Sequence, residues 1–270
     1  MTYETYKVSI ENHIAVVSFN RPNKANCLNQ KGWEELQQVF EDMDANPEVR
    51  VVVLTGEGKH FCAGIDTSML MDNVQHKGIK CEGRRREAFL IGTGKLQRNV
   101  TAIEKCRKPV IAAIHKACVG GAIDIITACD MRYATTDSYF SIKEIDWALV
   151  ADLGTLQRLP KIINPSIAAE LAYTGRQFDA AEAKEMGLVG QVFEDKEQMM
   201  QHVMDIATTI ASKSPLCIRG TKQMLLYTRD HTVEEALNHQ VLWNAAMIYS
   251  DDLMEAGMAN MQKRKPTFKN

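Results

Sequence analysis

The chain has 270 residues, 32 basic and 34 acidic side chains, a formal net charge of -2 and 45% hydrophobic residues. This composition excludes a disordered chain, and the length is ample for a buried core. The near-neutral charge argues against a protein whose main role is to bind nucleic acid or an anionic membrane, because both need a basic surface. Any polyanion that the protein binds must therefore be held by a local group of residues.

Seven cysteines stand at irregular spacing without a CxxC pair, which is typical of free, buried thiols in a reducing compartment. The histidines form no HxxxH or HExxH motif, so the sequence predicts no metal site. No apolar run approaches the ~18 residues of a membrane span, and neither end carries a recognisable targeting signal. We therefore expect a cytoplasmic protein that binds no membrane.

Strands and helices alternate along the first half of the chain. Apolar alternation over residues 6–10 and 14–19 predicts a hairpin, and the continuous apolar run 51–54 predicts a buried strand. This order is typical of an α/β protein with buried, largely parallel strands. The other predicted elements are a loop over 21–29, an amphipathic helix over 30–44, a strand over 110–114, a helix over 122–129, and short strands over 131–134 and 139–142.

The second half differs in pattern. Residues 72–100 are polar, and we interpret them as a mobile lid or a surface helix, with the basic run 84–86 as a solvated face rather than a phosphate clamp. After Pro160 the pattern is helical almost throughout, without a linker. We therefore divide the chain into a core over residues 1–200 and a helical region over 201–270 of the same fold. The helices expected in this half cover 166–174, 180–186, 196–212 and 234–249.

Three acidic residues stand in otherwise apolar surroundings: Asp124, Glu144 and Asp152. Carboxylates are seldom buried without a partner or a chemical task. Each residue also has an ordinary interpretation, because Asp124 would suit the first turn of a helix, Glu144 a surface beside Lys143, and Asp152 a turn. For each acid taken singly, the ordinary interpretation is favoured over a catalytic one. The coincidence of the three acids with two glycine turns favours a catalytic role.

The two glycine turns span residues 61–66 and 119–122. Glycine after a strand lets backbone N–H groups point at a ligand oxygen. Two such groups that converge on one carbonyl oxygen form an oxyanion hole, which stabilises an enolate. The alternative is that both segments are simply tight turns. The chain lacks the GxxxxGK[ST] and GxGxxG motifs, which argues against nucleotide hydrolysis and dinucleotide redox chemistry.

Four stretches resemble the crotonase, or enoyl-CoA hydratase/isomerase, superfamily. Asp124 and Glu144 match two acid positions that hydratases also use, and Asp152 matches the extra acid of the Δ(3,5),Δ(2,4)-dienoyl-CoA isomerases. Residues 212–237 and 263–268 resemble the family's C-terminal helices, so the likeness covers nearly the whole chain. The four stretches are RPNKANCLN (21–29), FCAGID (61–66), KPVIAAIHKACVGGAIDIITACDMRYAT (108–135) and LGTLQRLPKII (153–163).

The resemblance implies a spiral of repeated ββα units and a C-terminal helical region that assembles a homotrimer or a dimer of trimers. It implies an acyl-CoA thioester of fatty acid β-oxidation as substrate, with no separate cofactor because coenzyme A is part of the substrate. The N–H groups of Ile65 and Gly121 would hold the thioester oxygen. The implied substrate-binding residues are Ala63, Gly64, Ile65, Asp66, Thr67 and Gly121, and the implied CoA contacts are Lys24, Ala25 and Lys263.

Three acids suit an isomerisation of a 3,5-dienoyl-CoA to the 2,4-isomer, because a proton leaves C2 and another arrives at the distant C6. By resemblance, Asp152 is the base at C2, Glu144 is the donor at C6, and Asp124 tunes their charge or positions a water. Burial and mutual repulsion separate the pKa values of such a pair. In the alternative, a 2-enoyl-CoA hydratase, Asp124 and Glu144 activate a water that adds across C2=C3. The substitution Asp152→Asn distinguishes the two, since we expect it to abolish isomerisation.

Two bulky residues introduce further alternatives. Lys116 stands where the family has glycine, and we expect its side chain to reach solvent rather than act in catalysis. Trp147 either narrows the acyl chamber or belongs to the core. Rival functions are another crotonase chemistry, such as thioester hydrolysis, and RNA binding by a member of the same fold. The basic segments 84–86 and 263–265 are short for RNA binding.

Overall fold

The computed structural model describes residues 2–69 and 78–270. Its centre is a six-stranded sheet with the order β1-β2-β3-β4-β6-β9, and a second sheet has the order β5-β7-β8. A hairpin joins β1 and β2, whereas β2, β3, β4, β6 and β9 pair in parallel, as predicted for an α/β fold. The strands are β1 (Tyr6–Glu11), β2 (Ile14–Phe19), β3 (Val51–Gly56), β4 (Val110–Ile114), β5 (Ala117–Val119), β6 (Met131–Thr135), β7 (Tyr139–Ser141), β8 (Phe178–Asp179) and β9 (Gln191–Phe193).

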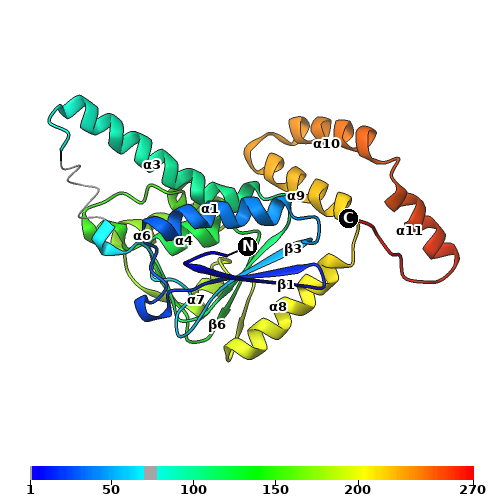
Figure 1. The fold of residues 1–270 in the computed structure, drawn as a ribbon, viewed down its shortest axis with the longest axis horizontal. Coiled ribbons are helices and arrows are strands. Elements are labelled where there is room, and N and C mark those ends of the chain that lie inside the picture. The colour runs from blue at the N-terminus through cyan, green and yellow to red at the C-terminus, as the bar shows by residue number, and fades with distance from the viewer. Residues whose placement is uncertain (1, 70–77) are drawn as a thin grey trace.

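Helices cover both faces of the large sheet (Figure 1). Val52 and Leu54 of β3 pack in a core with residues of α1, α3 and α4, whereas Val51 and Val53 pack against α8. Burial on both faces explains why the strands are continuous apolar runs. The helices are α1 (Gln30–Ala45), α3 (Glu82–Lys105), α4 (Gly121–Thr127), α5 (Thr155–Arg158), α6 (Pro165–Thr174), α7 (Ala180–Glu185), α8 (Lys196–Ala211), α9 (Pro215–Asp230), α10 (Val233–Met247) and α11 (Asp251–Met261), with 3-10 turns η1 (Pro22–Lys24), η2 (Lys143–Trp147) and η3 (Leu159–Lys161).

The chain moves between the two sheets in successive, similar turns. β4 of the large sheet is followed by β5 of the small sheet and then by α4, and β6 is followed in the same way by β7 and η2. The turn before them follows β3 with Cys62, which forms a parallel bridge to Cys118 of β5. This arrangement matches the expected spiral of ββα units. It also brings the two glycine turns side by side, because each follows the small-sheet segment of its own turn.

The expectation of helix almost throughout the second half misses two short strands, which lie between the predicted helices. β8 pairs with β7, and β9 adds to the edge of the large sheet beside β6. Strands of two or three residues are too short to give a periodic pattern. Residue 200, the expected border of the helical region, falls inside α8, whose Val203 packs on the large sheet. The division into residues 1–200 and 201–270 therefore stays a prediction.

Two sets of helices extend beyond this core (Figure 1). Only the second half of α3 is buried, around Val100 and Ile103, while its first half projects away from the sheets. The helix confirms the surface-helix interpretation for residues 82–100, whereas residues 72–77 lie outside the described residues. Arg86 forms an exposed ion pair with Glu82, as expected of a solvated face. On the other side, α10 and α11 continue outward from α9.

All seven cysteines carry free thiols, as expected. Four are buried and Cys27 is half-buried, but Cys81 and Cys217 are exposed, so the expectation of burial is wrong for these two. In the described part of the chain, no helix is both long and apolar enough to cross a membrane.

Candidate active site

A cavity of about 250 Å³ opens beside the two glycine turns. Part of its lining belongs to the core of the fold, namely residues of the segments 63–67 and 119–121 with Trp33 of α1, and we call this part the inner wall. Most of the remainder comes from the middle of α3, over residues 89–96, and from the segment 143–153, and we call it the outer wall; Gln30 of α1 also lines the cavity. The two predicted turns thus lie at one site, together with two of the three predicted acids.

Close packing fixes the backbone of the inner wall. Gly64 has φ +85°, and a Cβ atom at this residue would lie 2.5 Å from the carbonyl oxygen of Val119. A Cβ atom at Gly121 would lie 3.0 Å from Cη2 of Trp33 and 3.8 Å from the backbone nitrogen of Ile65. Residue 64 therefore requires glycine, since any side chain there would push the two turns apart, while a side chain at residue 121 would press on the Trp33 ring. The nitrogen atoms of Ile65 and Gly121 are held close together as a result.

These two backbone N–H groups are free to bind a ligand. The neighbouring groups of Ile65 are used, because the Leu28 N–H donates to Gly64 O at 2.8 Å and the Asp66 N–H donates to Leu28 O at 2.9 Å. Among the described residues, no acceptor takes the N–H of Ile65 or of Gly121. Both residues line the cavity. Two free, adjacent donors on a rigid backbone have the geometry of an oxyanion hole.

Glu144 and Asp152 are the carboxylates among the described residues that line the cavity. Glu144 lies in η2, and its Oε2 atom is buried without a hydrogen-bond partner in the described structure. Burial raises the pKa of Glu144, and the negative charge of Asp152 raises it further. Asp152 is more exposed, and partial burial raises its pKa as well. The two groups are close enough to influence each other, which suits a pair that exchanges protons with one ligand.

Asp124 has a different place. It lies in α4 with 1% of its surface exposed, and its Oδ1 atom accepts hydrogen bonds from Thr155 N at 2.6 Å and Thr155 Oγ1 at 2.7 Å. Burial raises the pKa of Asp124 to about 7, the charge of Glu144 adds to this, and the Thr155 hydrogen bonds oppose it. Asp124 is not among the described residues that line the cavity. Its role in catalysis stays a prediction, and its link to the cavity in this structure is the charge interaction with Glu144 and Asp152.

The predicted substrate-binding residues fall into two groups. Ala63, Ile65, Thr67 and Gly121 line the cavity. Gly64 and Asp66 do not, within the described lining, and the binding roles of all six residues stay predictions. Gly64 is packed against the next turn, and Asp66 is turned away to an ion pair with Arg21 at 3.2 Å.

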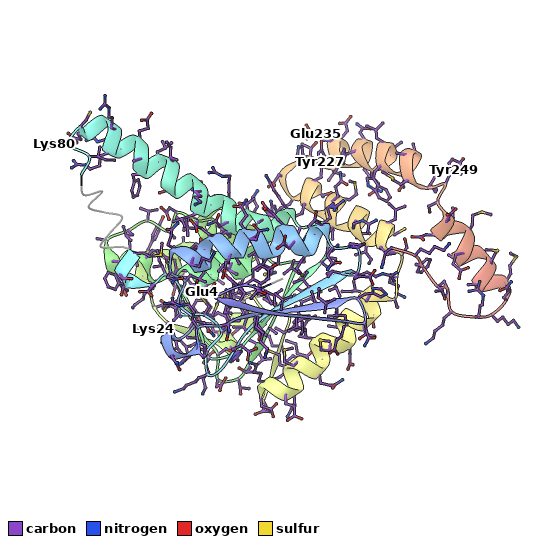
Figure 2. All side chains as sticks on the ribbon, in the orientation of Figure 1. Glu4, Lys24, Lys80, Tyr227, Glu235 and Tyr249 are labelled. Carbon is purple, nitrogen blue, oxygen red and sulfur yellow. The ribbon has the colours of Figure 1, made fainter. Side chains whose placement is uncertain are left out.

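The expected CoA contacts are not brought together by one chain. Lys24 and Ala25 end η1, and the Ala63 N–H donates to Ala25 O at 3.0 Å, so this turn lies directly beside the inner wall. Lys263 follows α11, which lies at the opposite end of the molecule from Lys24 (Figures 1 and 2). The CoA-binding roles stay predictions, and that of Lys263 requires a second copy of the chain.

The structure shows where the two bulky residues Lys116 and Trp147 lie relative to the cavity. Lys116 has φ +54° and pairs with Asp137 at 2.8 Å, and it does not line the cavity in the described part of the chain. The left-handed backbone explains why glycine suits this position. Trp147 is 53% exposed and lines the cavity, so it is not a core residue.

Sequence reasoning missed several residues of the site. Trp33 is expected as a core residue of its helix, but its contact with Gly121 gives no signal in the sequence. The α3 residues of the outer wall include a glycine and a threonine, so the apolar stripe is interrupted. Thr155 is the first residue of α5, directly after Gly154. The first backbone N–H groups of a helix have no partner within the helix, so this position could have indicated a hydrogen-bond donor to Asp124.

Comparisons with known proteins show which family the chain resembles over nearly its whole length. The family model described as enoyl-CoA hydratase/isomerase matches residues 9–270. A protein of Arabidopsis thaliana named peroxisomal Δ(3,5)-Δ(2,4)-dienoyl-CoA isomerase is 46% identical over 99% of both chains, and a human protein named as the mitochondrial isomerase is 42% identical over 98% of this chain and 81% of its own. A crystal structure of enoyl-CoA hydratase from Bacillus anthracis has a TM-score of 0.86 at 31% identity, covering 98% of this chain and 99% of that one.

Proposed function

The chain belongs to the enoyl-CoA hydratase/isomerase family, and we propose that it isomerises 3,5-dienoyl-CoA thioesters to 2,4-dienoyl-CoA thioesters. The observation that carries this function is the presence of two carboxylates, Glu144 and Asp152, in one cavity with a pair of free backbone N–H groups. A reaction that removes a proton at C2 and returns a proton at the distant C6 suits two such groups, one near each carbon.

In this mechanism the thioester oxygen accepts hydrogen bonds from the N–H groups of Ile65 and Gly121. The Asp152 carboxylate takes a proton from C2, and the electron pair of that C–H bond forms a trienolate, conjugated with both C=C bonds, whose charge rests on the thioester oxygen. The N–H groups stabilise this charge because they are already in place and need no reorganisation. Glu144 then donates its proton to C6, and the double bonds shift to C2=C3 and C4=C5. Exchange with solvent restores both carboxyl groups.

The surroundings of the two acids support this assignment of roles. Glu144 is the more buried, and both burial and the charge of Asp152 raise its pKa, which favours the protonated donor. Asp152 is more exposed, so its carboxylate is better solvated and suits the base. Asp124 supports the pair from behind the cavity, since its charge state affects both. Coenzyme A is part of the substrate, and no separate cofactor enters the proposal.

The position of Asp124 argues against the hydratase alternative. A hydratase of this family type would use Asp124 and Glu144 together on one water. In this structure Asp124 Oδ1 is held by two hydrogen bonds from Thr155, and the residue lies outside the described lining of the cavity. Asp152 occupies the place of a second acid instead.

The function is tested by incubating the purified protein with a 3,5-dienoyl-CoA and, separately, with a 2-enoyl-CoA. We expect the absorbance of the conjugated 2,4-dienoyl product to rise with the first substrate, and little loss of the 2-enoyl absorbance with the second. Rapid hydration of the 2-enoyl-CoA without isomerisation would instead support the hydratase, and release of free CoA from either substrate would support thioester hydrolysis.

The same proposal includes a homotrimer or a dimer of trimers built through the C-terminal helices. Ala236 is the buried residue of α10, while Leu237, Val241 and Leu242 are each more than 60% exposed. Exposed apolar side chains of this kind are suited to burial against a second copy of the chain. Sedimentation of the wild type and of Leu242→Glu tests this, because the variant should shift to a smaller species. A monomeric wild type would contradict it.

The cell compartment also stays a prediction. The Arabidopsis relative is named peroxisomal and the human relative mitochondrial. For this chain we keep the cytoplasmic location, and fractionation of the source cells tests it.

A further inference from the structure

Five residues of α3 line the outer wall of the cavity, and four of them form one face of the helix; the fifth, Lys95, pairs with Glu34 at 2.7 Å. Phe89, Gly92, Thr93 and Leu96 follow the i, i+3, i+4, i+7 spacing that places side chains above one another. The first and last are large and apolar. Gly92, which has no side chain, and the small Thr93 leave a gap between them, which we call the Gly92 gap.

The fold itself gives no reason for glycine at residue 92. Its backbone is helical without a positive φ, and a Cβ atom there would meet no atom within 4 Å. Gly121 and Gly220 differ from Gly92 in this respect, because a Cβ atom at either residue would press against a tryptophan ring. Glycine inside a helix lowers stability relative to alanine. Gly83 of the same helix has equally open space, but Gly92 differs from it because Gly92 lines the cavity, where a ligand can occupy the space that a side chain would fill.

The Gly92 gap lies nearer the exposed end of α3 than the level at which Asp152 contacts this helix. The side chain of Gln97 on α3 donates a hydrogen bond to the backbone oxygen of Asp152 at 2.7 Å. Asp152 therefore lies beside Gln97 along the length of α3. Gly92 is five residues nearer the exposed end of α3, or about 7.5 Å along the helix at 1.5 Å per residue. Trp147 and Val150, which also line the cavity, are 53% and 72% exposed. Exposed apolar side chains around an open gap suit an apolar ligand.

We propose that Gly92 is a specificity-determining residue, which leaves a passage for the acyl tail beyond the diene and lets the enzyme accept long acyl chains. The inference rests on the isomerase function proposed above, because the reacting carbons are placed at Glu144 and Asp152. The part of the chain beyond C6 then leaves the carboxylates toward the exposed end of α3. A side chain at residue 92 would block this path.

The test compares kcat/KM for an eight-carbon and a fourteen-carbon 3,5-dienoyl-CoA in four proteins: wild type, Gly92→Ala, Gly92→Leu and Gly83→Leu. Gly83 is the matched control, since it lies on the same helix, is exposed, and also has no atom within 4 Å of its Cβ position. We expect Gly92→Leu to lower kcat/KM for the longer substrate by about tenfold or more, as for groups that exceed a pocket, and to leave the shorter one nearly unchanged. Gly92→Ala should have a smaller effect of the same kind, and Gly83→Leu should have none.

Two results would overturn the proposal. An equal fall in kcat/KM for both substrates in Gly92→Leu would mean that glycine serves the flexibility of α3. A kcat/KM that stays at the wild-type value for both substrates would mean that the acyl tail follows another path. Circular dichroism and thermal unfolding check that each variant is folded, which we expect because leucine favours the helix. Calorimetric binding of octanoyl-CoA and tetradecanoyl-CoA separates this proposal from the function. If the wild type isomerises neither substrate but Gly92→Leu weakens only tetradecanoyl-CoA, the function is wrong and the passage stands.

Discussion

The inner wall of the cavity acts through a closely packed backbone, whereas the outer wall acts through its side chains. On the inner wall, Gly64 and Gly121 leave no room for a Cβ atom, and the useful groups are backbone N–H donors. On the outer wall, Gly92 has open space around it, and the useful groups are the side chains of Glu144 and Asp152. The inner wall is therefore fixed by packing, while the outer wall is defined by which side chains it carries.

This difference separates chemistry shared by a family from the features of one enzyme. A rigid pair of N–H donors stabilises any thioester enolate, whatever follows it in the acyl chain. The carboxylates and the gaps of the outer wall decide which proton moves and which chain fits. Substitutions on the inner wall should therefore impair every reaction of the site, and those on the outer wall should select among reactions and substrates.

The largest expected effect is that of Asp152→Asn on the outer wall. Loss of the base should lower kcat for isomerisation by about 10²- to 10⁴-fold, the usual contribution of a general base. Acyl-CoA binding should change little, because the amide keeps the shape of the carboxyl group. Stopped-flow measurement of the 2,4-dienoyl product together with calorimetric binding checks both parts.

Asp205→Asn serves as the control, since Asp205 is exposed on α8 and its contact is a hydrogen bond from Gln201 on the same helix. It should leave kcat unchanged. Isomerisation at the wild-type rate in Asp152→Asn would remove Asp152 from the mechanism.

A slightly smaller effect is expected from Gly121→Ala on the inner wall. The new methyl group would meet the Trp33 ring at 3.0 Å and displace one N–H donor. Loss of an oxyanion-hole donor lowers kcat by about 10²- to 10³-fold. The effect should fall on kcat more than on KM, because the charge on the thioester oxygen develops in the transition state. Steady-state kinetics with a 3,5-dienoyl-CoA measures this split.

The double variant Gly121→Ala with Trp33→Phe tests the cause. The smaller ring leaves room for the methyl group, so part of kcat should return. If Trp33→Phe gives no recovery, contact with the ring is not what fixes this backbone.

Much of this site follows from the sequence, and the reasons for the exceptions are physical. Asp124, Glu144 and Asp152 are detectable because a carboxylate in an apolar run is costly and needs a reason. The Gly92 gap cannot be detected in this way, since the sequence shows only an isolated glycine in a polar helix, whether or not a ligand uses the space beside it. In the fold, β9 is missed because its three residues gain their strand character from pairing with β6, a contact distant in the sequence. Local patterns predict local structure, while contacts between distant segments leave a weaker trace.

A third effect concerns Asp124, which lies behind the inner wall. Its pKa is about 7 in the folded protein, above the ordinary value of 3.8, so the folded state holds the proton more tightly than the unfolded state. Its contribution to stability is therefore fully present below about pH 4 and falls as the pH rises from there to about 7. The difference corresponds to about 4 kcal/mol at 1.36 kcal/mol per pKa unit.

Asp124→Asn removes this charge and keeps an acceptor for Thr155. We expect the variant to be more stable than the wild type at pH 8 by about 1–3 kcal/mol, less than the full difference because the new amide N–H groups lack partners. At pH 4 the two proteins should unfold alike or the variant slightly earlier. Urea unfolding at both pH values measures this. A variant that is less stable at pH 8 would show that the charged carboxylate, with its Thr155 bonds, stabilises the fold.

The smallest effect on activity is expected at Lys116, which separates backbone conformation from charge near the inner wall. Its ammonium group pairs with Asp137 outside the described cavity lining, so Lys116→Gly should keep kcat/KM unchanged. Lys116→Val should also keep it but should lower the stability by about 1–2 kcal/mol, because a β-branched residue is strained at φ +54°. Thermal unfolding of the two variants beside the wild type shows this difference. A fall in kcat/KM common to both variants would mean that the positive charge itself acts on the site, and the inner wall would then no longer work through its backbone alone.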